Sequence, residues 1–202
     1  AGIDRQKLPE LVPVDSVLGP ILPEVATEWG LSPNTKVVAA TSDSQAAVLG
    51  SGAVDDFAGH LCIGTSSWLT CHVPFKKTDL SRYLATMPSA IRGKNMVVAE
   101  QGPAGKCLET LVERWLRTSP EGARIEAEEE RFLELTRGAA AVPAGSKNLI
   151  FLPWLNGPGP PVSDSYVRGG FLNQTLEHDA AHAFRAVMEG VAYNVRWLTS
   201  AV

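Results

Sequence analysis

The sequence lacks the features that mark secreted, membrane-spanning and nucleic-acid-binding chains. Its 202 residues include only three cysteines, Cys62, Cys71 and Cys107. Their spacing does not suggest a disulfide framework, so we expect a reducing, cytoplasmic environment. No apolar run approaches the roughly 18 residues of a membrane span. Lys and Arg total 18 against 22 Asp and Glu, with no basic cluster, so we expect neither a membrane nor a nucleic acid as a partner.

The two ends of the chain lack the signals of a complete polypeptide. The sequence begins with Ala1 rather than an initiator Met, and it has neither the basic nor the apolar region of a signal peptide. At the other end, residues 197–202 continue a helical pattern without a Gly, Asn or Pro stop signal. We therefore expect an internal piece of a longer protein.

The composition is that of a folded globular chain of one or two domains, with 45% hydrophobic and 20% charged residues. Apolar stretches predict a short buried strand at 36–40, two strands within 57–75 joined at Gly64-Thr65-Ser66-Ser67, and strands at 96–99 and 148–153. Helical patterns fall at residues 24–29, 103–117, 121–137 and 178–200. Because strands alternate with helices, the sequence predicts an α/β fold.

Side chains that the patterns place in the interior are mostly apolar. Gly138 is the expected end of the charged helix at 121–137. The last helix carries a core stripe of Phe184, Val187, Met188, Val191, Val195 and Leu198. We expect core or interdomain positions for Trp68, Trp115, Trp154 and Trp197.

His178 and His182 have the helical spacing of a zinc chelate, but the sequence offers no third ligand near them, so we expect no metal site.

A single carboxylate, Asp43, follows the strand at 36–40 and precedes a short helix closed by Gly52. It could cap that helix by accepting a backbone N–H, which is worth about 1 kcal/mol. It could instead be a general base, because α/β proteins place ligands at the ends of their strands. The adjacent Ser44 could contact a substrate hydroxyl or could itself cap the helix.

Two glycine-containing segments are candidates for phosphate contacts. Gly64 is followed by Thr65 and two serines, so this turn could offer N–H and O–H donors, or could be an ordinary hairpin turn. Gly105 lies at the start of the helix predicted at 103–117, where a glycine permits close backbone approach. Helix entry alone would also explain that glycine.

Taken together, these segments resemble the FGGY carbohydrate kinases. The resemblance is carried by "VVAATSDSQAAVLGSGA", "GHLCIGTSSWLTCHVP", "AEQGPAGKCLETL" and "FLPWLNGPGPPVSDSYVRGGFLNQTLEHDAAHAFRAVMEGVAYNVR", in that order. It extends over essentially all 202 residues, with the xylulokinase-like branch most similar. It implies an actin-like ATPase fold with ribonuclease H-like domains and phosphorylation of a sugar hydroxyl with MgATP.

The same resemblance implies roles for individual residues. Asp43 corresponds to the catalytic base, beside Ser44 as a sugar contact, while Gly64, Thr65 and Gly105 correspond to positions that meet the nucleotide. It also implies that residues 1–54 end an N-terminal sugar-kinase domain and that residues 55–202 begin a nucleotide-binding domain.

The expected partners are ATP, Mg²⁺ and a sugar, with a pentulose such as xylulose as the expected substrate, and a homodimer stays open. Asn173 and the loop at 156–161 depart from the family pattern, which usually has Gly at the first position and an acidic-basic pair in the second. Glycerol, gluconate or another ketose is therefore an alternative substrate, and a non-catalytic sugar or nucleotide sensor is an alternative function.

Overall fold

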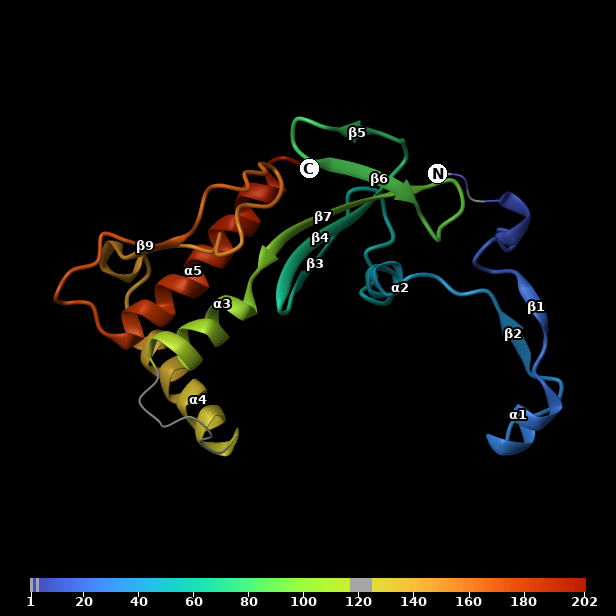
Figure 1. Cartoon of the computed structure of the whole chain (residues 1–202), viewed down its shortest axis with the longest axis horizontal. Coiled ribbons are helices and arrows are strands. Elements are labelled where there is room, and N and C mark those ends of the chain that lie inside the picture. The colour runs from blue at the N-terminus through green and yellow to red at the C-terminus, as the bar shows by residue number, and fades with distance from the viewer. Residues whose placement is uncertain (1, 3, 117–124) are drawn as a thin grey trace.

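The computed structural model describes residue 2 and residues 4–116 and 125–202 (Figure 1). Its first region contains two short strands and two short helices. In chain order these follow a 3₁₀ turn at Arg5–Lys7 and are β1 (Val17–Pro20), α1 (Pro23–Glu28), β2 (Lys36–Val38) and α2 (Asp43–Gly50).

Strands β1 and β2 pair with each other in antiparallel fashion, forming a two-stranded ribbon. Helix α1 begins with Pro23 in its first turn, where the missing N–H costs nothing. The predicted helix and strand are confirmed here, but all three residues of β2 are exposed, so the expected buried strand is wrong in this respect. The reason is that β2 has β1 as its one partner strand and nothing covers its faces within the described chain.

A five-stranded antiparallel sheet occupies the middle of the chain. Its strands are β3 (Gly59–Ile63), β4 (Ser66–Val73), β5 (Thr78–Asp79), β6 (Leu84–Pro88) and β7 (Asn95–Pro103). Their spatial order is β3-β4-β7-β6-β5. The predicted hairpin at 57–75 and the strand at 96–99 are confirmed, whereas β5 and β6 were not predicted.

Helices dominate the last part of the described chain. The elements are α3 (Gly105–Thr110), a π-helical turn (Leu111–Trp115), α4 (Ile125–Ala141), a 3₁₀ turn (Ser146–Asn148), β8 (Ile150–Leu152), β9 (Gly170–Leu172) and α5 (Ala180–Thr199). Strand β8 pairs with β9, which was not predicted. The predicted first residues of the charged helix, 121–124, lie outside the described residues.

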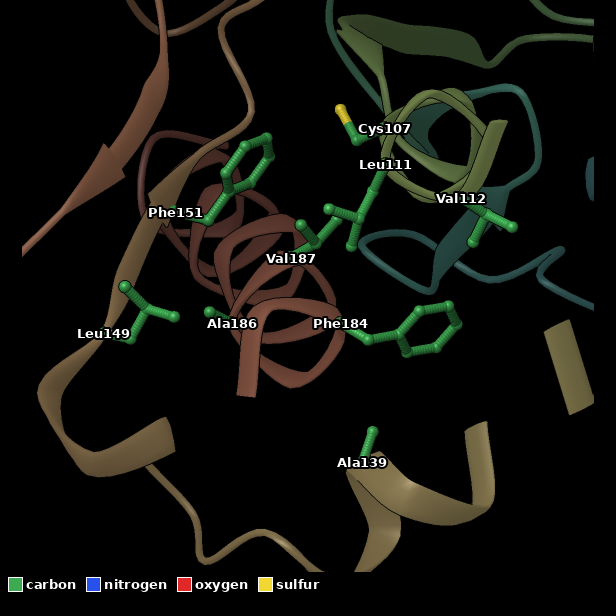
Figure 2. Close-up of a cluster of buried hydrophobic side chains, with 9 residues drawn as sticks. All are labelled: Cys107, Leu111, Val112, Ala139, Leu149, Phe151, Phe184, Ala186 and Val187. Atoms are coloured by element: carbon green, nitrogen blue, oxygen red, sulfur yellow. The ribbon is translucent and has the colours of Figure 1, made fainter. Parts of the chain in front are cut away.

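The largest hydrophobic core gathers around α5. Phe184 and Val187 of this helix are 1% and 0% exposed. They belong to one buried cluster with Leu111 after α3 and Phe151 of β8, and Figure 2 shows the separate elements that contribute these side chains. Fully burying such a side chain contributes about 1.5–3 kcal/mol, so this cluster holds α3, α4, β8 and α5 together.

Two smaller clusters cover opposite faces of the sheet. Successive residues of a strand point to opposite faces, and β7 follows this rule. Its Ala99 packs with Leu198 from the end of α5, while its Met96 packs with Val48 of α2. Helices α5 and α2 are therefore both fixed to the same sheet, one on each side.

Some predicted helix features differ from the structure. Gly138 does not end α4, which continues to Ala141. A Cβ at Gly138 would lie 3.2 Å from the Ala181 Cβ, so this glycine lets α4 and α5 pack closely. Met188 is 44% exposed and faces away from the core stripe, whose other members are buried.

The tryptophans are less buried than expected. Trp115 is 47% exposed and Trp197 is 36% exposed. Each lies at the edge of an aromatic group: the Trp115 ring is 6.3 Å from that of Phe151, and the Trp197 ring is 6.1 Å from that of Trp154. Large indole rings here cover the rim of the core rather than fill its centre.

Candidate active site

The turn between β3 and β4 packs directly against the first residues of α3. The Gly105 N–H donates to the Gly64 carbonyl oxygen at 2.8 Å. The Thr65 carbonyl oxygen accepts from the N–H groups of Ala104 and Lys106, at 2.9 and 3.2 Å. The structure therefore brings together the two segments that the sequence predicts as phosphate contacts, and we call residues 64–65 and 104–106 the glycine corner.

The glycine corner leaves no room for a side chain at position 105. A Cβ built on Gly105 would lie 2.7 Å from the Gly64 carbonyl oxygen and 3.3 Å from its carbon. Carbon atoms in contact normally lie about 3.5–4.0 Å apart. Glycine is thus required at this position by the approach of two backbone segments, as expected for Gly105.

The hydrogen-bond pattern decides which groups of the corner can meet an anion. The Gly64 N–H donates to the Ser66 carbonyl oxygen at 2.9 Å, so it is already used. The first N–H groups of α3 are likewise satisfied by the turn. Across the described residues, neither the N–H nor the hydroxyl of Thr65 has a partner, and Thr65 is exposed. Thr65 is therefore the residue of the pair with free donors.

Asp43 is the first residue of α2, and Ser42 is the residue that precedes the helix as its N-cap. The Asp43 Oδ1 atom accepts the N–H of Ser44 at 2.7 Å, and the Ser42 and Ser44 hydroxyls lie 3.1 Å apart. The carboxylate is exposed, and its Oδ2 has no hydrogen-bond partner in the described part of the chain. The prediction of Asp43 as the N-cap is therefore wrong, because Ser42 occupies the cap position and, among the described residues, the Asp43 carboxylate accepts only the adjacent Ser44 N–H. Its free Oδ2 is compatible with the predicted general base.

Helix α2 is held on the sheet by a buried glutamine that sequence reasoning missed. The Gln45 side chain donates to the Pro88 carbonyl oxygen at 3.2 Å and accepts from the Ala90 N–H. One turn later, Val48 is fully buried against Met96. Gln45 follows two polar residues at a helix start, so nothing in its local pattern distinguishes it from an exposed side chain. These contacts fix the Asp43 end of α2 relative to β7, which leads to the glycine corner.

The linker between α2 and β3 is also tied to the sheet. The His72 Nδ1 atom lies 2.8 Å from the Ala53 carbonyl oxygen, and His72 is 1% exposed. Lys94 contacts the Val54 carbonyl oxygen at 2.9 Å and the Asp56 carboxylate at 3.0 Å. The segment at 53–56 is therefore held in place by side chains from β4 and from the residues just before β7.

The histidines expected not to bind a metal serve helix α5. Asp179 caps this helix: its Oδ1 accepts the His182 N–H at 3.0 Å and lies 2.6 Å from His182 Nδ1. Hydrogen bonds from the His182 backbone and side chain lower the pKa of Asp179. His178 Nδ1 accepts the Thr175 N–H at 3.0 Å. In residues 4–116 and 125–202, no group of three potential ligands comes together.

No helix in the described part of the chain is long and apolar enough to span a membrane.

Burial raises the pKa of the Cys107 thiol to about 11, because the thiol lies in the main core and has only distant carbonyl contacts. This cysteine is a core residue and is not part of the site.

The described chain is thus an α/β protein in which a glycine-containing turn packs on the first residues of α3 and an exposed carboxylate stands at the start of α2. The model of the FGGY C-terminal domain matches residues 60–202, and that of the N-terminal domain matches residues 1–50. The chain belongs to the FGGY family of carbohydrate kinases, which confirms the resemblance in its sequence.

Individual relatives support the same placement. The chain is 31% identical over 198 residues to the xylulose kinase of Lactococcus lactis, covering 96% of this chain and 36% of that protein. It is 31% identical over 199 residues to the gluconokinase of Bacillus subtilis, covering 96% of this chain and 38% of that protein. The chain thus spans little more than a third of these relatives' length.

Solved structures confirm the actin-like ATPase fold. Xylulose kinase from Rhodospirillum rubrum superposes with a TM-score of 0.78 at 26% identity. Gluconate kinase from Lactobacillus acidophilus superposes with a TM-score of 0.79 at 27% identity. In both cases the match covers 98% of this chain and 38% of the other.

Proposed function

We propose that the complete protein containing this chain phosphorylates a sugar hydroxyl with MgATP, and that residues 1–202 supply the general base and part of the nucleotide site. The observation that carries this proposal is the glycine corner, where Gly105 approaches the Gly64 carbonyl too closely for any side chain. This approach fixes the turn on the first residues of α3 and leaves the Thr65 donors exposed to a phosphate group. Membership of the FGGY family supports the same activity.

The free donors of the corner fit a nucleotide phosphate. The Thr65 N–H and hydroxyl have no partner in the described chain and are exposed. Donors placed where negative charge develops stabilise the transition state of phosphoryl transfer. We assign Thr65 as the direct phosphate contact and Gly64 and Gly105 as the residues whose close backbone contact positions it. Mg²⁺ would arrive with the nucleotide and neutralise phosphate charge.

Asp43 is the proposed general base. Its Oδ2 atom is available to accept the proton of the attacking sugar hydroxyl, while its Oδ1 atom is held by the Ser44 N–H. A positioned base contributes about 10²–10⁴-fold to the rate. Ser44, whose hydroxyl lies beside Ser42, is the proposed contact to a neighbouring sugar hydroxyl.

Two sugars are candidates for the substrate. The xylulose kinase and the gluconokinase relatives are equally identical to this chain, at 31%. Xylulose and gluconate both carry a primary hydroxyl on a chain of hydroxyl-bearing carbons, so the same general base could serve either substrate. We propose a pentulose such as xylulose, with gluconate as the second candidate.

We also propose a domain boundary at residues 54–55. The two family models leave residues 51–59 between them. The linker contacts of His72 and Lys94 would then fix the junction from the side of the nucleotide-binding domain. A structure of the complete protein tests this: a core that residues 1–54 share with the β3–β7 sheet, beyond the cluster of Val48, Ala53 and Met96, would contradict the boundary.

The test of the base is Asp43→Asn in the complete protein, with ADP release measured over xylulose, gluconate and glycerol. Asn keeps an oxygen that can accept the Ser44 N–H but cannot accept the proton, so we expect kcat to fall at least about 100-fold with KM for MgATP nearly unchanged. Asp55→Asn removes another exposed carboxylate and is the matched control. Wild-type kcat in a folded Asp43→Asn variant would eliminate Asp43 as the base. Absence of phosphorylation of any sugar by the unaltered protein would contradict the kinase activity itself.

A further inference from the structure

Gln101 is a fully buried polar residue in β7, four residues before Gly105 of the glycine corner. It is 1% exposed. Its Nε2 donates to the Asn194 carbonyl oxygen of α5 at 2.6 Å and to the Pro160 carbonyl oxygen at 3.2 Å. A single side chain therefore connects a strand, a helix and the Gly/Pro-rich loop at 156–161.

The orientation of this amide is fixed by chemistry. Carbonyl oxygens only accept hydrogen bonds, so the Gln101 NH₂ group must face both of them. Its Oε1 is buried and has no partner within residues 4–116 and 125–202. An unpartnered buried acceptor lowers stability, so the stabilising contribution of this side chain comes from the two bonds that its Nε2 makes.

The loop rests on the same point of the strand. A Cβ on Gly159 would lie 2.8 Å from both the Gln101 Cα and the Glu100 carbonyl oxygen. In the sheet, Glu100 is paired with Trp68 of β4, three residues after Thr65. The loop at 156–161, the end of β7 and the glycine corner thus form one continuous piece of packed backbone.

Asn194 of helix α5 is also buried and makes a second hydrogen bond through its side chain. Asn194 is 8% exposed, and its Oδ1 accepts the Trp154 indole N–H at 3.1 Å. Trp154 lies two residues before the loop. Gln101 and Trp154 therefore both attach the loop region to the same residue of α5, one through its backbone carbonyl and the other through its side chain.

We propose that Gln101 is a positioning residue of the nucleotide site. It holds the loop at 156–161 and helix α5 against β7, which ends at Pro103, and so keeps the strand that leads to the glycine corner in a fixed position. This inference rests on the proposed kinase function and adds a residue to it that contacts no substrate.

The decisive variant is Gln101→Leu in the complete protein. Leucine has a similar volume but no N–H group, so both carbonyls lose their donor. We expect KM for MgATP to rise about 10-fold, with KM for the sugar within about twofold of the wild type. Gly159→Ala disturbs the same contact from the loop, so it should also raise KM for MgATP and leave KM for the sugar nearly unchanged. Because position 159 is in a loop, that variant decides the question if Gln101→Leu does not fold.

A pH profile separates positioning from bulk stability. In Gln101→Glu the ionised carboxylate would face two carbonyl oxygens, whereas the protonated acid can donate to one of them. The defect in KM for MgATP should therefore shrink as pH falls, in contrast to the pH-independent defect of Gln101→Leu. The control is Thr70→Val, which removes another fully buried, unpartnered polar atom from the same sheet and should leave both KM values unchanged.

Equal changes in both KM values, or a wild-type KM for MgATP in folded Gln101→Leu and Gly159→Ala variants, would overturn the proposal while leaving the kinase activity in place. If the unaltered protein phosphorylates no sugar, the proposed function fails instead. The dissociation constant of MgADP, measured by calorimetry in the same variants, then still tests Gln101: an unchanged value in both variants overturns its role.

Discussion

Gly105→Ala should disrupt the glycine corner, although alanine is the better helix former. Glycine in a helix costs roughly 0.5–1 kcal/mol relative to alanine, so propensity alone predicts stabilisation. The structure predicts the opposite, because the new Cβ would lie 2.7 Å from the Gly64 carbonyl oxygen. Relieving that overlap lengthens the 2.8 Å bond between Gly105 N–H and Gly64. Overpacking of this kind costs about 1–3 kcal/mol, which outweighs the gain.

The matched control is Gly50→Ala at the end of α2. A Cβ there has no atom within 4 Å, so the same substitution should stabilise the protein by about 0.4–1 kcal/mol. Urea unfolding of both variants of the complete protein, together with KM for MgATP, tests the pair. We expect free energies of unfolding that change in opposite directions, and a raised KM in Gly105→Ala alone. A Gly105→Ala variant as stable as Gly50→Ala, with unchanged KM, would refute the reasoning about the corner.

Three further outcomes follow from the packing around α5 and the main core. Gly190→Ala should lower the free energy of unfolding by about 3 kcal/mol or more, because its Cβ would lie 2.2 Å from the Phe151 carbonyl oxygen; thermal unfolding measures this, and a stability equal to the wild type would contradict the contact. Asp179→Ala should lower the free energy of unfolding by about 0.5–2 kcal/mol, because the helix loses its cap. Since the pKa of Asp179 is lowered in the folded state, the stabilisation by its carboxylate is present above pH 3.8 and is lost as pH falls below that value. A cost of the substitution that stays unchanged in acid would argue against the cap. Cys107, whose pKa is raised to about 11 by burial, should react with a maleimide far more slowly than the half-buried Cys62 at pH 8, and equal rates by mass spectrometry would contradict its burial.

The sequence predicts the elements that carry a strong local pattern. The hairpin around Gly64 and the long helix α5 are confirmed because alternation and helical spacing extend over many residues there. Strands β5 and β9 escape prediction, since two or three residues cannot show a period and the strands exist only through their partners. The extension of α4 beyond Gly138 has a tertiary cause, the close approach of Ala181.

The same division applies to the candidate site. Asp43, Gly64, Thr65 and Gly105 are identifiable because each stands at the junction of two predicted elements. Which donors are free is not predictable from sequence, because the Gly64 N–H is taken by a residue two positions away only in the folded turn. Gln101 has no local signal at all: its role depends on carbonyl groups brought from distant parts of the chain.

Asn173 shows how a departure from a family pattern can be neutral. It stands where the family usually has glycine, and its φ is +61°. Asparagine is among the residues that tolerate this left-handed conformation. The backbone requirement is thus met by a different residue, and the side chain adds a hydrogen bond from its Nδ2 to the Asn148 carbonyl oxygen at 3.0 Å.

The bonds of the glycine corner join segments about 40 residues apart, which affects the order of folding. The β3–β4 hairpin is local and can form in about 1–10 μs. The carbonyls of its turn gain their partners only after β7 has paired with β4 and α3 has begun, which requires closing a long loop. The corner therefore forms after the hairpin, once β7 has paired with β4. A nucleotide bound there would slow unfolding and leave the folding rate almost unchanged.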